Sequence, residues 1–192
     1  MSAMRLNDPL PSFFEFEEKE YPLNLAFDRV LDVFDVLSDD GMNLPDKVET
    51  CIKILVGDVG LDIISQFVMF RELYDTYLVF GKKSEVVTDE LGNVMPMKPV
   101  SKDMDIVLDA KYIYASFRQI GINLFEEQGR LSWEEFQVLL ETLPDDTPIQ
   151  KIKSIRNWKP QKGERTEHKE QMRELQRRYA LPNYVREEEE DG

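Results

Sequence analysis

The sequence predicts a mainly α-helical protein, a single bundle-like domain with a β-hairpin near its N-terminus. Apolar residues recur at spacings of three and four through most of the chain, whereas an alternation of period two occurs at residues 13–25. The length of 192 residues is also enough for one domain with a sizeable core. We therefore place one domain at residues 1–182 and expect a disordered acidic tail at residues 183–192.

The hairpin is predicted from apolar residues that alternate with charged and polar ones. The residues Glu18 and Lys19 are expected to turn the chain between the two strands. An isolated two-stranded hairpin is only marginally stable, so this one should lie on a helical core. The alternating apolar residues are Phe14, Phe16, Tyr21, Leu23 and Leu25.

Three helices are expected over about residues 26–80. The first ends near Gly41, which can take the left-handed conformation of a C-terminal cap, and Pro45 suits the first turn of the second. The third, at about residues 61–80, is apolar around more than half of its circumference. Such a helix is typical of the buried centre of a bundle, and a subunit interface is the alternative.

Residues 81–103 predict a mobile linker, because they contain two glycines, two prolines and many polar residues without helical periodicity. Helices resume over about residues 104–181. The last of these, near residues 166–180, carries Met172, Leu175 and Tyr179 on one face and many charges on the other. The first of these helices is expected to bury a stripe formed by Val107, Ala110, Tyr114 and Phe117 and broadened by Ile106, Ile113 and Ile120.

Two helix starts are marked by capping signals. The side chains of Ser132 and Glu135 have the spacing of a capping box, in which each accepts a hydrogen bond from the other's backbone N–H. Asp145 and Asp146 are expected to cap the short helix that begins after Thr147.

The formal net charge of −14 is unevenly distributed. Residues 151–186 contain eleven Lys and Arg and four acids, a net of +7, and the tail at 187–191 adds five acids, which leaves −16 for residues 1–150. A body this acidic repels phosphate backbones and argues against nucleic acid as the main partner. The basic segment either meets an acidic partner or folds back on the acidic body of its own chain.

The residues that catalysis usually requires are scarce. His168 is the only histidine and Cys51 the only cysteine, so the chain offers no Cys/His zinc cluster, and no Gly-rich phosphate loop precedes a helix. We expect no catalytic residue, no metal or other cofactor and no small-molecule substrate. A hydrolase that uses surface carboxylates is the enzyme alternative, disfavoured because such pairs are common on acidic surfaces. No secretory signal or membrane span is expected either.

Two stretches of the second half carry a resemblance to a known family. The first is 109–117, followed by 121–124, and the second runs from Leu131-Ser132-Trp133-Glu134-Glu135-Phe136 through 139–147 to Ile155-Arg156, before the chain closes with 177–182. This order resembles the bacteriophage "gp fifteen" family of small tail proteins from phages of Gram-positive hosts with long non-contractile tails. The resemblance covers about residues 13–182 and is strongest over 105–182. One departure is Ser132, where the family often has a second aromatic residue before Trp133.

The resemblance implies a tail assembly chaperone, encoded between the tail tube and tape measure proteins, that keeps the tape measure protein soluble. It implies the host cytoplasm as location and absence from the finished virion. The expected partners are the tape measure protein, then the tail tube protein or a second copy of this chain. The alternative is a structural minor tail or connector protein retained in the virion.

Such a chaperone needs apolar surface for its partner, and the helix at about 61–80 is the best candidate because its apolar arc is wide. Plain core packing of the same residues is an equally good interpretation. A second candidate is the basic last helix. The partner-binding residues expected on these two helices are Phe67, Phe70, Tyr74, Arg173, Arg177 and Arg178.

Overall fold

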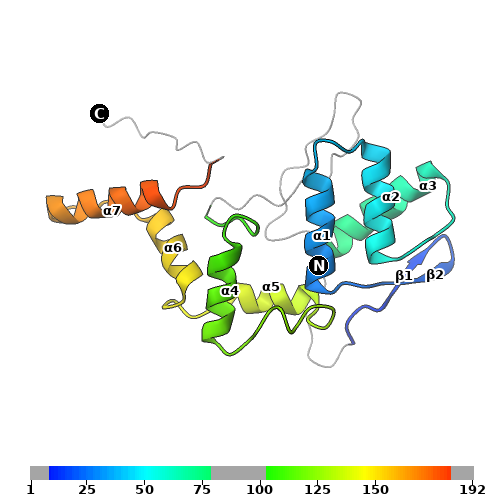
Figure 1. Ribbon diagram of the computed structural model, residues 1–192, viewed down its shortest axis with the longest axis horizontal. Helices are drawn as coiled ribbons and strands as arrows, with labels where there is room; N and C mark the ends of the chain where they lie inside the picture. Colours follow the sequence, from blue (N-terminus) through cyan, green and yellow to red (C-terminus); the bar gives the residue numbers. More distant parts are fainter. Residues whose placement is uncertain (1–8, 79–102, 183–192) are drawn as a thin grey trace. The chain divides into compact units, whose positions relative to one another are not determined.

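The computed structural model describes residues 9–78 and 103–182 (Figure 1). Within these ranges the protein is mainly helical with an antiparallel N-terminal hairpin, which confirms the predicted fold class. The expected linker at 81–103, apart from Asp103, and the expected disordered tail at 183–192 lie outside the described residues.

The described residues form two compact units. The N-terminal unit comprises 9–78 and 125–141, and the C-terminal unit comprises 103–124 and 142–182. The single cooperative domain expected from the sequence stays a prediction. The N-terminal unit contains β1 (Phe13–Phe16), β2 (Lys19–Pro22), α1 (Phe27–Ser38), α2 (Leu44–Leu55), α3 (Ile63–Leu73), the π-helical turn η1 (Tyr74–Leu78) and α5 (Trp133–Glu141). The C-terminal unit contains α4 (Ala110–Gln119), α6 (Pro148–Asn157) and α7 (Thr166–Arg178).

The hairpin turns one residue earlier than predicted. Phe16 pairs with Lys19, so the two loop residues are Glu17 and Glu18, with φ angles of 49° and 61°. A two-residue hairpin loop of this kind requires positive φ at both central positions, and the strand twist favours it even without glycine. Lys19 therefore belongs to β2, where its ammonium group lies 4.7 Å from the centre of the Tyr21 ring.

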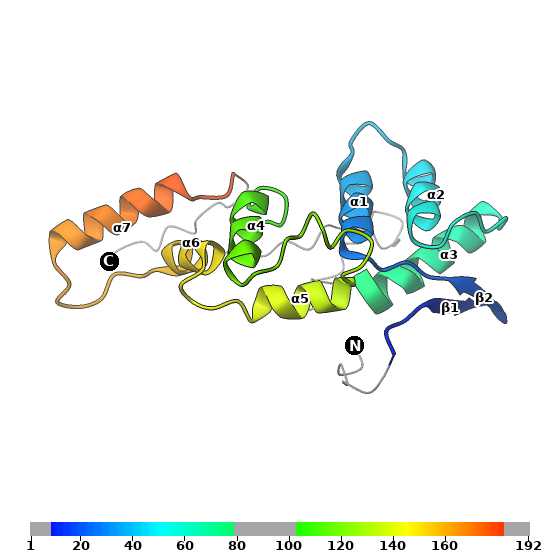
Figure 2. The same ribbon diagram turned by 60° about the horizontal axis from the view of Figure 1, so that its bottom comes forward.

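The core of the N-terminal unit forms where α1 packs against α2 and α5. Figures 1 and 2 show α1 and α2 side by side, joined by a short connection. The Phe27 and Phe136 rings stack at 5.1 Å, and Phe34 meets Trp133 edge-on at 5.6 Å. Contacts between aromatic rings contribute about 0.5–1.5 kcal/mol each beyond the burial of their area.

Backbone hydrogen bonds hold α5 in the N-terminal unit, although more than 90 residues separate it from α1. The Phe27 N–H donates to the Leu131 carbonyl at 2.9 Å, and the Trp133 N–H donates to the Leu25 carbonyl at 2.7 Å. Residues 125–141 thus complete a core that residues 9–78 begin.

The capping box at the start of α5 is confirmed. The backbone N–H of Ser132 donates to the Glu135 carboxylate at 3.1 Å, and the N–H of Glu135 donates to the Ser132 hydroxyl at 3.2 Å. At α2, Pro45 lies in the first turn as predicted, and the Asn43 side chain accepts the Asp46 N–H at 3.0 Å.

The prediction for the end of α1 is wrong in its detail. Gly41 does not have a positive φ; the helix ends at Ser38 and is followed by Asp39 in an extended conformation, with φ −77° and ψ 104°. The Asp39 carboxylate accepts the Gly41 N–H at 2.8 Å. A local side-chain acceptor of this kind turns the chain without a left-handed residue.

The buried stripe of α4 agrees with the prediction only in part. Ile113 and Phe117 are buried as predicted, together with Ser116, whereas Val107 precedes the helix and is exposed. The helix begins only at Ala110, so the stripe is set by the residues that face α6, and one of them is a polar serine.

That serine replaces the capping expected from Asp145 and Asp146. The Ser116 hydroxyl accepts the N–H of Ile149, in the first turn of α6, at 3.0 Å, and this bond is buried. Asp146 instead accepts a hydrogen bond from the Gln119 amide at 3.0 Å. The aspartate capping prediction is therefore wrong, because a neighbouring helix supplies the acceptor.

A buried ion pair lies at the centre of the C-terminal unit. The Arg156 guanidinium forms two hydrogen bonds to the Asp109 carboxylate, at 2.6 and 2.8 Å, and their side chains are 9% and 2% exposed. The same guanidinium donates to the backbone carbonyls of Asp103 at 2.9 Å and Tyr179 at 2.7 Å. One side chain of α6 therefore joins the segment before α4 to the residue that follows α7.

The helix α7 is fixed on α6 by a buried amide. The Gln176 side chain donates to the carbonyls of Ile155, Arg156 and Trp158, at 2.9, 3.3 and 2.8 Å. These carbonyls lie at the C-terminal end of α6, where helices lack intrahelical donors, and among the described residues the Trp158 N–H also donates to the Ile155 carbonyl, at 3.2 Å. Gln176 is therefore a structural residue that the apolar pattern of α7 does not reveal.

Candidate protein-binding surface

The helix α3 begins at a well-defined cap. The Asp62 carboxylate accepts the N–H groups of Ile64 and Ser65 at 3.0 and 3.2 Å, and the Ser65 hydroxyl at 2.7 Å. These hydrogen bonds, with that of the Ser65 side chain first, lower the pKa of Asp62. The cap fixes where the helix starts and hence which of its side chains point outward.

One face of α3 is buried, and it is narrower than the sequence predicted. Met69, Phe70 and Leu73 lie in the core, with Phe70 only 2% exposed. Their spacing of three and four places them on a single side of the helix. The expectation that this helix is the buried centre of a bundle is therefore wrong, since among the described residues its other side is largely exposed.

The opposite face of α3 is apolar as well and lies at the surface. Ile63, Ile64 and Val68 are 44%, 74% and 45% exposed, and Phe67 between them is half-buried. Pairs of residues four apart, here 63 with 67 and 64 with 68, are neighbours on a helix surface. We call these four residues, Ile63, Ile64, Phe67 and Val68, the α3 face.

The sequence-predicted binding residues are divided between the core and two different surfaces. Phe67 belongs to the α3 face, whereas Phe70 is a core residue. Tyr74 is half-buried at the start of η1, its ring 6.1 Å from that of Phe70, and burial raises the pKa of its hydroxyl. The basic residues Arg173, Arg177 and Arg178 are exposed on α7, in the other unit.

The binding residues predicted from the sequence did not include Ile63, Ile64 and Val68. A signal was present, because two adjacent apolar pairs, 63–64 and 67–68, lie four residues apart. These pairs define a stripe opposite Met69 and Leu73. A helix that is apolar on two sides has the same sequence pattern whether the rest of the protein covers both sides or only one of them.

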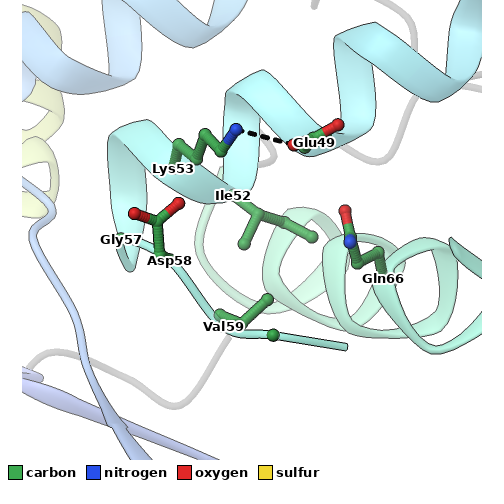
Figure 3. Close-up of a pocket in the computed structure, with 8 residues that line it drawn as sticks. Glu49, Ile52, Lys53, Gly57, Asp58, Val59 and Gln66 are labelled. Carbon is green, nitrogen blue, oxygen red and sulfur yellow. Dashed lines mark hydrogen bonds and ion pairs between the residues drawn. The ribbon is translucent and has the colours of Figure 1, made fainter. Parts of the chain in front are cut away.

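A small pocket adjoins α3 (Figure 3). It has a volume of about 240 Å³ and is lined by the end of α2, the connection to α3 and one residue of α3 itself. Ile52, Val59 and Gln66 face it from these three elements, and Lys53 at its rim is paired with Glu49 at 2.6 Å. Ligand pockets usually measure roughly 300–1,000 Å³. The size suits one side chain better than a metabolite.

The acidic residues give the N-terminal unit a strong negative charge. Its described residues include 20 Asp and Glu and 6 Lys and Arg, a net of −14. Asp58 and Asp62 precede the α3 face, and Glu72 and Asp75 follow it, all four of them exposed. The apolar face is therefore bordered by carboxylates at both of its ends.

The remaining candidate residues show ordinary structural roles. His168 is exposed on α7, with its Nδ1 2.7 Å from the Glu164 carboxylate and its ring against Trp158. Cys51 is buried, and burial raises the pKa of its thiol from 9.0 to about 12. In the part of the chain that the structure describes, no three His, Cys, Asp or Glu side chains gather as a metal site would require.

None of the helices within residues 9–78 and 103–182 has the length and apolar character needed to span a bilayer.

Fold and surface together define a mainly helical protein with an N-terminal hairpin and an exposed apolar helix face on an acidic unit. The family model described as Bacteriophage Gp15 protein matches residues 6–181. The chain belongs to this family, and the resemblance found in the sequence is confirmed at that level. No curated protein and no solved structure matches the chain.

Proposed function

We propose that this protein is a tail assembly chaperone that binds the tape measure protein through the α3 face and keeps it soluble in the host cytoplasm. Membership of a bacteriophage family supports a role in the phage particle or its assembly. The observation that carries the proposal is the α3 face, where Ile64 is 74% exposed. Burying an aliphatic side chain of this size contributes about 1.5–3 kcal/mol, so an uncovered stripe favours a protein partner.

The acidic charge of the same unit supports a dispersing role. A net charge far from zero keeps protein chains apart in solution, and 20 acids against 6 bases give the N-terminal unit such a charge. A complex with an aggregation-prone helical chain would inherit this charge and remain soluble. We assign no catalytic step and no cofactor to this role.

Co-expression with the tape measure protein of the same phage tests the proposal. The wild-type protein should raise the soluble fraction of the tape measure protein and be recovered with it by affinity capture. Ile64→Ser should lose most of this effect without unfolding, because exposed substitutions usually change stability by no more than about 0.5 kcal/mol. Leu108→Ser is the matched control, since Leu108 is an exposed leucine of the other unit.

The outcome that contradicts the proposal is equally concrete. If wild-type protein leaves the tape measure protein insoluble and captures none of it, the chaperone role is wrong. Mass spectrometry of purified virions then distinguishes the structural alternative, a minor tail or connector protein. Stoichiometric amounts in the virion would favour that alternative, and absence would contradict it as well.

A further inference from the structure

The α3 face meets the pocket at one of its ends. Gln66 lines the pocket, and Ile63 of the α3 face precedes it by three positions on the same helix. Residues three apart are neighbours on a helix surface, so the end of the α3 face at Ile63 adjoins the pocket.

The chemistry of the pocket favours a hydrogen-bond donor. The Gln66 amide donates to the Leu61 carbonyl at 2.8 Å, whereas its oxygen, Oε1, is buried and has no hydrogen-bond partner among the described residues. Two carboxylates, those of Glu49 and Asp58, also line the pocket, and its single cation, Lys53, is already bonded to Glu49. Acceptors therefore outnumber donors.

Apolar walls accompany these acceptors. Ile52 is buried at the base of the pocket, and Val59 lies across from it (Figure 3). A lysine or arginine side chain combines a long apolar stem with a charged donor at its tip. Its stem can lie against Ile52 and Val59 while its tip meets the carboxylates of Glu49 and Asp58.

We propose that this surface binds an amphipathic helix of a partner protein whose apolar stripe is bordered by lysines and arginines. The stripe covers the α3 face, and one basic side chain enters the pocket. The carboxylates of Asp58, Asp62, Glu72 and Asp75 supply the complementary charge. The identity of the partner rests on the proposed function, in which this helix belongs to the tape measure protein.

Two synthetic helical peptides with the same apolar stripe test the inference on the full-length protein. One has lysines beside the stripe and the other glutamates, and fluorescence anisotropy measures the affinity of each. The lysine peptide should bind at least about tenfold more tightly, and added salt should reduce the difference. Equal affinities, or no binding of either peptide, would overturn the inference.

Single-residue variants test whether the lysine peptide binds at this surface. Ile64→Ser should weaken the lysine peptide about tenfold, because a large apolar side chain no longer becomes buried. Asp58→Asn should weaken it about two- to fivefold, as expected for one exposed charge pair. The controls Leu108→Ser and Asp145→Asn, exposed residues of the other unit, should leave the affinity unchanged. Equal losses in variants and controls would show non-specific attraction to the acidic protein and refute the site.

Failure of this inference and failure of the proposed function give different results. If Ile64→Ser captures the tape measure protein as well as wild type does, the surface is wrong and the chaperone role stands. If wild type captures no tape measure protein but prefers the lysine peptide through Ile64, the surface stands and the partner is another protein.

Discussion

Replacing Asp109 by asparagine is expected to destabilise the C-terminal unit by about 3–5 kcal/mol, the usual cost of leaving one member of a buried ion pair without its partner. Asparagine has nearly the same shape, so the change removes the charge without opening a cavity. Arg156 keeps its bonds to the carbonyls of Asp103 and Tyr179, yet loses the carboxylate that neutralises it. Since domains are stable by only about 5–15 kcal/mol, this loss is large.

Lys153→Met provides the control for this prediction. Its ammonium group lies 3.7 Å from the Asp103 carboxylate in the same unit, but both side chains are more than a quarter exposed. An exposed pair of this kind contributes no more than about 1 kcal/mol.

The double variant Asp109→Leu with Arg156→Met removes both charges and should cost less than the sum of the two single changes, with a coupling of roughly 1–3 kcal/mol.

Urea unfolding followed by circular dichroism measures the total loss of stability. Hydrogen exchange of peptides from α6 and α7 then shows whether the loss falls in the C-terminal unit. An effect of Asp109→Asn no larger than that of Lys153→Met would refute the reasoning, and so would strictly additive single variants.

Two further predictions concern the N-terminal unit. Burial raises the pKa of the Cys51 thiol from 9.0 to about 12, so the unfolded chain loses this proton at a lower pH than the folded protein does. The contribution of Cys51 to the free energy of unfolding is therefore fully present below pH 9.0 and falls as the pH rises towards about 12. Urea melts against Cys51→Ala across this range check the prediction, and an identical pH dependence would contradict it. Ser132→Ala should cost about 1 kcal/mol by breaking the capping box, while Ser132→Thr should restore most of it. Denaturation midpoints measure both, and an unchanged midpoint in the alanine variant would show that the cap contributes nothing.

Local signals in the sequence predicted the secondary structure well where a single segment contains both partners of an interaction. The capping box of Ser132 and Glu135 and the placement of Pro45 in the first turn of α2 depend on residues within a few positions. The hairpin was also correct, although the turn was placed one residue late and the return strand, predicted to include Leu23 and Leu25, ends at Pro22. Positive φ at Glu17 and Glu18 reflects the strand register and not the preference of either residue.

The candidate site was only partly predictable. The wide apolar arc of α3 left Phe70 open to two interpretations, a binding surface or the core, and it lies in the core, whereas Ile64 was not proposed as a binding residue and is exposed. Periodicity shows which residues share a face. It does not show which of two apolar faces meets the rest of the protein, because that depends on residues distant in sequence.

The sequence by itself determined the helical class, the N-terminal hairpin, the uneven charge and, through the residues around Trp133, the family. Only the tertiary structure decided that residues 125–141 complete the core begun by residues 9–78, that Arg156 pairs with Asp109, and that Ser116 caps α6. Each of these contacts joins segments far apart in the chain. A hydrogen bond or a packed ring needs a partner at a defined distance in space, and local patterns of residues contain no information about that distance.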